Sequence, residues 1–109
     1  MEMRECYGRE QKHITDETDL LAAEIAAQFR KEAQESKADI GVADPLLKAA
    51  SAVEQSQRTW KTYRDQHCDA VAYSWTTGSG ASTAHEACMF QLGQARLREL
   101  RTDFNQESK

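Results

Sequence analysis

Two cysteines enclose a short glycine-containing segment in residues 68–88, which read CDAVAYSWTTGSGASTAHEAC. The sequences on both sides have helical patterns, so we expect two helices joined by a turn at residues 76–82. An antiparallel arrangement of these helices would bring Cys68 and Cys88 together, either as a disulfide or as two reduced, buried thiols. The candidate turn consists of Thr76, Thr77, Gly78, Ser79, Gly80, Ala81 and Ser82.

The helices predicted on either side of this turn each have one apolar stripe. The first is expected over residues 45–75, because Asp44 followed by Pro45 is a helix-start signal. The second is expected over residues 83–104, because Thr83 and Glu86 match a capping box. The first stripe follows the alternating steps of four and three of a coiled coil and contains Leu46, Ala50, Val53, Gln57, Trp60, Arg64, His67 and Val71. The second follows steps of four and contains Cys88, Leu92, Arg96 and Leu100.

A third long helix is predicted in the N-terminal part, over residues 2–37, with a connector at residues 38–45. A break at Thr15–Asp16 is left open, because both residue types also cap helices. The apolar positions repeat at helical spacing and comprise Tyr7, Ile14, Leu21, Ile25, Phe29 and Ala33. The three elements predict an all-α fold, a three-helix antiparallel bundle with long helices.

The amino-acid composition argues against a nucleic-acid-binding protein and against a membrane-spanning one. The 109 residues carry a formal net charge of −4 and contain one proline and five glycines. An acidic chain is an unsuitable nucleic-acid binder, and it has no apolar run near the ~20 residues of a membrane span. No signal peptide is visible in residues 1–5, which suits either a cytoplasmic chain or a mature chain whose leader has been removed.

Histidines beside the cysteines raise the question of a metal site. The set His67, Cys68, His85 and Cys88 has the ligand count of a structural zinc site. His67 and Cys68 are adjacent, however, and side chains of adjacent helical residues diverge by ~100°. We therefore expect no metal and no cofactor. No convincing catalytic set or phosphate-binding motif is present either, so we expect a protein that is not an enzyme.

The densest group of informative residues lies at 60–65. Trp60 and Tyr63 are three residues apart and meet on one helical face, so we expect both in the core. Arg64 lies on the apolar stripe and needs a carboxylate or helix-end carbonyls if it is buried. Asp65 is expected to pair with Arg96 of the last helix.

This group belongs to a longer pattern that resembles the LprI-type lysozyme-inhibitor family. The pattern is WxxYRDxxC, then a glycine-containing loop, then CxxxLxxxRxxxL, and it is followed closely over residues 57–102. The matching residues are Trp60, Tyr63, Arg64, Asp65, Cys68, Cys88, Leu92, Arg96 and Leu100. Met3 and Cys6 near the start are also similar to the family. The resemblance implies one helical LprI-like domain over residues 1–109, export to the periplasm or cell surface, and a disulfide between Cys68 and Cys88. It leaves Cys6 either free or bonded to a cysteine upstream.

Some members of this family inhibit lysozyme. The resemblance and the acidic charge imply a secreted or periplasmic binding protein that inhibits lysozyme or another cell-wall hydrolase by occluding its cleft. Residues 76–82, anchored by the disulfide, are the candidate plug. The alternative is a periplasmic interaction module without inhibitory activity, in which Trp75 and the apolar stripe of the first helix bind another helix.

Overall fold

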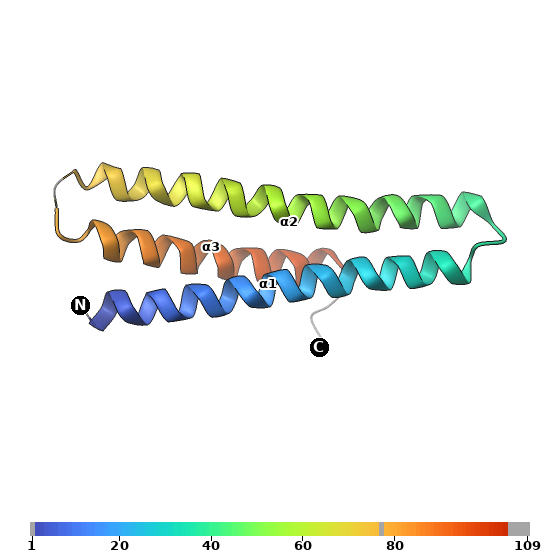
Figure 1. The fold of residues 1–109 in the computed structure, drawn as a ribbon, viewed down its shortest axis with the longest axis horizontal. Helices are drawn as coiled ribbons and strands as arrows, with labels where there is room; N and C mark the ends of the chain where they lie inside the picture. Colours follow the sequence, from blue (N-terminus) through green and yellow to red (C-terminus); the bar gives the residue numbers. More distant parts are fainter. Residues whose placement is uncertain (1, 77, 105–109) are drawn as a thin grey trace.

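The computed structural model describes residues 2–76 and 78–104, with side chains from Cys6 onward. Three helices, α1 (Glu2–Glu35), α2 (Ile40–Ser74) and α3 (Ala81–Asp103), run alternately up and down in a rod of 60 × 24 × 16 Å (Figure 1). The described residues contain no strand. The predicted all-α, three-helix antiparallel fold is confirmed. None of the described helices is long and apolar enough to cross a membrane.

The start of α2 differs from the prediction. The helix begins at Ile40, and Asp39 caps it by accepting a hydrogen bond of 3.1 Å from the Gly41 backbone N–H. The prediction of a start at Asp44–Pro45 was therefore wrong, and the connector is shorter than residues 38–45. Pro45 lies inside the helix, where it removes one bond to the Gly41 carbonyl. Gly41 is exposed, so water can hydrogen-bond to that carbonyl.

The start of α3 also differs. The helix begins at Ala81 with Gly80 as its N-cap and no side-chain cap, so the capping box of Thr83 and Glu86 was wrong. Both residues lie inside α3, because Gly80 packs against an aromatic ring and begins the helix earlier in the chain. In α1, the Thr15 hydroxyl donates to the Gln11 carbonyl at 2.7 Å, and the helix continues through the position where a break was left open.

The predicted stripes form part of the core, which also contains Ala22, Ala26, Ala43, Met89 and Leu97. On α1, Ile14, Ile25 and Ala33 are buried, and Tyr7, Leu21 and Phe29 are half-buried. The α1 stripe is thus used inside the chain and is not free to bind another helix. On α2 the buried residue that follows Arg64 is Cys68, four positions later, whereas His67, three positions later, is exposed. The prediction that His67 belongs to the buried stripe was therefore wrong.

Tyr63 also differs from its prediction. It is 52% exposed and stacks on His67, with the ring centroids 5.5 Å apart. Trp60 is half-buried, and the guanidinium carbon of Arg64 lies 5.0 Å from its ring centroid. Only one aromatic residue of the pair therefore contributes to the interior.

A close approach of α1 and α3 depends on Gly93. A Cβ atom at this position would lie 2.5 Å from Cγ2 of Ile14, well inside van der Waals contact. We expect Gly93→Ala to lower the free energy of unfolding by about 1–2 kcal/mol in urea titrations, because overpacking costs more than the gain in helix propensity. Adding Ile14→Leu, which removes the Cγ2 branch, should restore most of the loss. Equal stability of wild type and Gly93→Ala would contradict the packing argument.

A buried polar layer joins the three helices near the middle of the rod. The Gln57 amide donates to Thr18 Oγ1 at 3.0 Å and to Asp19 Oδ1 at 2.9 Å. Its Oε1 accepts a bond of 2.9 Å from Arg96 Nε. Gln57 thus connects α2 to α1 and α3 at the same level, which sets the register of the bundle.

The predicted pair of Asp65 with Arg96 is not formed. Arg96 instead donates to Gln57, to Ser56 Oγ at 3.1 Å and to Glu99 Oε1 at 2.7 Å. Asp65 accepts bonds of 2.9 and 3.0 Å from Arg64, its neighbour in sequence. The long arginine side chain spans the angle between adjacent helical positions, which the prediction did not allow for.

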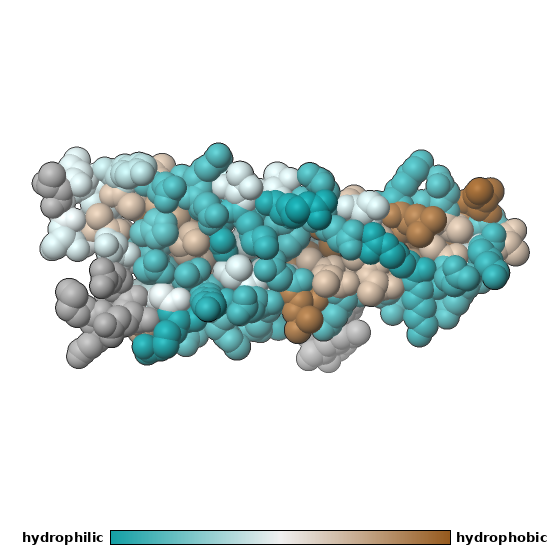
Figure 2. Space-filling model, viewed as in Figure 1, coloured by the Kyte–Doolittle hydropathy of each residue, from teal (hydrophilic) through white to brown (hydrophobic). Residues whose placement is uncertain are grey.

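The rod ends differently at its two tips. α3 is shorter than the other helices (Figure 1), so α1 and α2 continue beyond it as a pair toward the turn at Ser36–Asp39. Arg30 donates two bonds of 2.7 Å to Glu54 there, and this hydrogen bonding lowers the pKa of the Glu54 carboxyl. On the face drawn in Figure 2, hydrophilic residues predominate, and the most hydrophobic residues lie from the middle of the rod toward this end. The exposed apolar side chains near this turn are Ile40, Val42 and Leu47.

Candidate functional site

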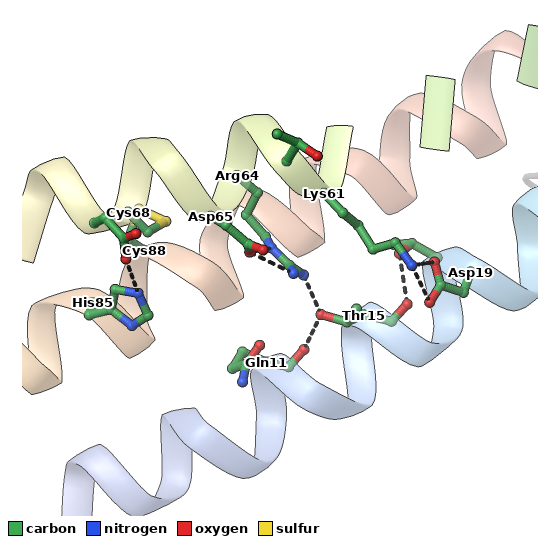
Figure 3. A network of polar contacts seen from close by, with 12 residues as sticks. Gln11, Thr15, Asp19, Lys61, Arg64, Asp65, Cys68, His85 and Cys88 are labelled. Atoms are coloured by element: carbon green, nitrogen blue, oxygen red, sulfur yellow. Dashed lines mark hydrogen bonds and ion pairs between the residues drawn. A yellow bond between two sulfur atoms is a disulfide. The ribbon is translucent and has the colours of Figure 1, made fainter. Parts of the chain in front are cut away.

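The disulfide predicted between α2 and α3 is present. Cys68 and Cys88 are bonded, with their Cα atoms 5.6 Å apart (Figure 3). The alternative of two reduced thiols is thus wrong for this structure. Cys68 lies less than two turns of helix before Ser74, the end of α2, so the bond ties the hairpin just inside its turn.

The candidate zinc ligands are not brought together. Both cysteines are oxidised, His67 faces Tyr63, and His85 lies against Asp69. Among the residues that the structure describes, no group of three or more His, Cys, Asp or Glu side chains could hold a metal ion.

The turn between α2 and α3 is folded around Trp75. The indole ring packs directly on Gly80, where a Cβ atom would lie 2.4 Å from Cζ3. The Gly78 N–H donates to the Trp75 carbonyl at 2.9 Å, and Thr76 has a φ of 54°, in the left-handed region. Gly78 and Gly80 both have negative φ. Glycine is therefore needed at Gly80 for the close approach of the ring and not for an unusual backbone conformation.

The candidate plug is shorter than predicted. Ala81 and Ser82 belong to the first turn of α3, and Thr77 lies outside the described residues. The described part of the turn consists of Thr76, Gly78, Ser79 and Gly80, next to Trp75. We call Trp75, Thr76 and residues 78–80 the α2–α3 tip.

Aromatic and acidic residues surround this tip. Tyr73 is 79% exposed and Trp75 is 50% exposed. Residues 65–95 contain no Lys or Arg but contain Asp65, Asp69 and Glu86. Aromatic residues often dominate the energy of protein interfaces, and a surface of one sign attracts partners of the opposite sign.

A set of polar contacts lies between α1 and the hairpin, just inside the tip (Figure 3). The Arg64 guanidinium is largely buried and donates to Thr15 Oγ1 at 2.6 Å and to Asp65. Arg64 therefore has the carboxylate that the sequence required for it. Lys61 of α2 pairs with Asp19 of α1 at 3.0 Å. These contacts hold α1 against α2 below the tip.

His85 also lies in this region. From the sequence it was considered as a member of the zinc set, which the structure does not form. Its Nε2 lies 3.2 Å from Asp69 Oδ1 across the hairpin, and its Nδ1 lies 3.5 Å from Glu86 Oε1. Once Cys68 and Cys88 are paired, the neighbouring parts of the two helices lie close together, and Asp69 and His85 are one and three residues inside the bond. That register was the available signal for the contact of Asp69 with His85.

Two cavities open beside these residues, of about 510 and 430 Å³. Gln11 and His85 line both, and the larger cavity also reaches Ser82 and Glu86. The Glu86 Oε2 atom is buried and has no hydrogen-bond partner within the described part of the chain.

Cys6 is exposed on α1 and is free within the described part of the chain. Its side chain therefore leaves both earlier alternatives, a free thiol or a bond to a cysteine upstream, unchanged.

Comparison with known proteins supports the resemblance found in the motif. The profile of a family described as lysozyme inhibitor LprI matches residues 1–100. No curated protein and no solved structure matches the chain significantly. The family is one of inhibitors and not of catalysts, and its description together with the disulfide suggests a location outside the cytoplasm. Because the match covers nearly the whole chain, the protein belongs to the lysozyme inhibitor LprI family.

Proposed function

We propose that this protein is a secreted or periplasmic inhibitor that binds lysozyme or another cell-wall hydrolase and blocks its substrate cleft with the α2–α3 tip. The observation that carries the proposal is the packing of Trp75 on Gly80 at the end of a hairpin tied by the Cys68–Cys88 bond. An inhibitor of this kind must present a convex, ordered surface to a concave site.

The order of the tip favours binding. A segment that is already ordered loses less conformational entropy on association, which preserves more of the contact energy. Thr76 and the hydrogen bond from Gly78 to Trp75 hold the backbone, and the disulfide holds the helices beneath it. Trp75 remains half-exposed and can therefore contact a partner while its other face stays on Gly80.

Charge supports the same class of partner. The net charge of −4 and the absence of basic residues from 65 to 95 favour association with a basic enzyme, and oppositely charged surfaces accelerate encounter. The effect weakens with salt, because charges more than ~8 Å apart are screened at physiological ionic strength.

The proposal is tested by a turbidity assay of lysozyme on a cell-wall suspension with increasing amounts of unreduced protein. We expect a concentration-dependent loss of lysis. Undiminished lysis at a large molar excess, repeated with several hydrolases, would reject inhibition and leave the alternative, an interaction module without inhibitory activity.

Replacing Trp75 tests whether the tip, and not another part of the surface, contacts the hydrolase. We expect Trp75→Ala to weaken inhibition roughly thirty-fold, or about 2 kcal/mol, the magnitude typical of a central aromatic contact. Tyr63→Ala is the matched control, since it removes an exposed aromatic side chain from α2, away from the tip. Equal loss in the two variants, or no loss in Trp75→Ala, would remove the tip from the interface.

A further inference from the structure

The larger cavity beside the tip has no role in the tip contact described above. It has a volume of about 510 Å³ and lies between all three helices, with Gly8 and Gln11 on α1, Ala72 on α2, and Ser82 and Glu86 on α3. Gln11 of α1 and His85 of α3, both labelled in Figure 3, line this cavity. A volume of this size is ample for one extended side chain of a partner.

Glu86 is incompletely satisfied in this position. Its Oε1 is 3.5 Å from His85 Nδ1, but its Oε2 is buried without a hydrogen-bond partner among the described side chains. A buried acceptor without a donor is energetically unfavourable, especially when it is charged. The side chain as a whole is 24% exposed, so a rotation of the carboxylate toward the cavity is not blocked by complete burial.

Gly8 lies close to this carboxylate. A Cβ atom at Gly8 would lie 3.7 Å from Glu86 Oε2, which is ordinary van der Waals contact, so the α1 backbone covers this oxygen. A ligand group therefore reaches the carboxylate when the Glu86 side chain turns toward the cavity.

Among the side chains that the structure describes, no Lys or Arg lines the larger cavity. Lys12 and Arg64 line the adjacent smaller cavity, and Arg64 is already bonded to Asp65 and Thr15. His85, which lines both cavities, faces Asp69. The larger cavity thus offers an incompletely satisfied carboxylate, with neutral polar groups of Gln11 and Ser82 around it.

We propose that this cavity binds one cationic side chain of the protein partner, a lysine ammonium or an arginine guanidinium, through Glu86. The cation donates to Oε2, the atom that now has no donor, and its alkyl stem lies along Ala72 and Ala81. The inference deepens the proposed function, since a basic hydrolase that contacts the tip has such side chains at its surface. The binding chemistry of the cavity itself is independent of which partner supplies the cation.

The cavity is tested first with small probes. Unreduced, ¹⁵N-labelled protein is titrated with n-butylguanidinium, with n-butylammonium and with the neutral analogue n-butylurea. We expect saturable amide shifts at Gly8, Gln11, Ser82 and Glu86 with at least one of the cations and no saturation with the urea. Equal response to the neutral analogue, or no saturable response to either cation, would overturn the proposal.

Glu86→Gln keeps the shape of the side chain and removes its charge. We expect this variant to bind the cation at least ten-fold more weakly, whereas Glu24→Gln, which changes an exposed carboxylate of α1, should bind as wild type does. The amide spectrum of each variant without ligand reports whether the fold is retained. A folded Glu86→Gln variant with undiminished affinity would also overturn the proposal.

Comparing probe binding with inhibition of a hydrolase distinguishes failure of this inference from failure of the proposed function. If wild type binds the cationic probes but inhibits no hydrolase, the cavity site stands and the inhibitory function fails. If wild type inhibits and Glu86→Gln inhibits equally well, the function stands and the role of the cavity in partner binding fails.

Discussion

Removing the Cys68–Cys88 bond is expected to lower the free energy of unfolding by about 3 kcal/mol. The bond closes a loop with a sequence separation of 20 residues, and the chain-entropy relation for such a loop gives about this value. Domains of this size are stable by only about 5–15 kcal/mol, so the loss is a large fraction of the total. The measurement is urea unfolding followed by circular dichroism on the double variant Cys68→Ala, Cys88→Ala.

Reduction of the wild-type protein provides the second arm of this experiment. Reduction breaks the same bond without removing the sulfur atoms, so a similar loss assigns the effect to the cross-link and not to the smaller side chains. Cys6→Ala, which changes an exposed free thiol, should leave the unfolding midpoint unchanged. A midpoint that does not move on reduction or in the double variant would contradict the prediction.

Arg96→Ala is expected to have a comparable or larger effect, about 3–5 kcal/mol. The guanidinium is buried and donates to Gln57, Ser56 and Glu99, and its carbon atom lies 6.0 Å from the Trp60 ring. The variant leaves Gln57 Oε1 buried without its donor, and it loses the packing of the long aliphatic stem. Thermal and urea unfolding measure the change.

The control replaces both partners of the buried bond. In the double variant Gln57→Leu, Arg96→Met, apolar groups of similar size fill the same volume, so we expect a smaller loss than in Arg96→Ala alone. Arg98→Ala, at an exposed position of the same helix, should change stability by less than about 0.5 kcal/mol. A loss below 1 kcal/mol for Arg96→Ala would show that the polar layer contributes little to the register of the helices.

The long helices could be predicted because the apolar spacing extends over many turns. Ile14, Val53 and Leu100 were placed in the core from this spacing alone, and all three are buried. The helix starts were less predictable, because short-range signals compete. Asp39 and Asp44 are both able to cap α2, and the choice of Asp39 depends on where the hairpin turn closes against α1.

Contacts between helices required information that spacing does not contain. Asp65 pairs with Arg64 and not with Arg96, because the long Arg64 side chain can bend back to the residue next to it in the same helix. The packing of Trp75 on Gly80 depends on the path of the turn, which turn composition alone left open. The contact of His85 with Asp69 could have been predicted from the register that the disulfide imposes on the hairpin, whereas the position of Glu86 against α1 could not.

Because α3 is shorter than α1 and α2, the bundle is expected to open locally at one end before the other. Beyond the end of α3, α1 and α2 are held together mainly by small side chains, including Ala33 and Ala43, and by the surface pair of Arg30 with Glu54. Regions with little buried apolar area open at lower free energy than the rest of a protein. Transient opening therefore starts at the turn around Ser36–Asp39 and stops where α3 covers the other two helices, at the core of Ile25, Val53 and Leu100, so the covalently closed end keeps its shape while the far end opens.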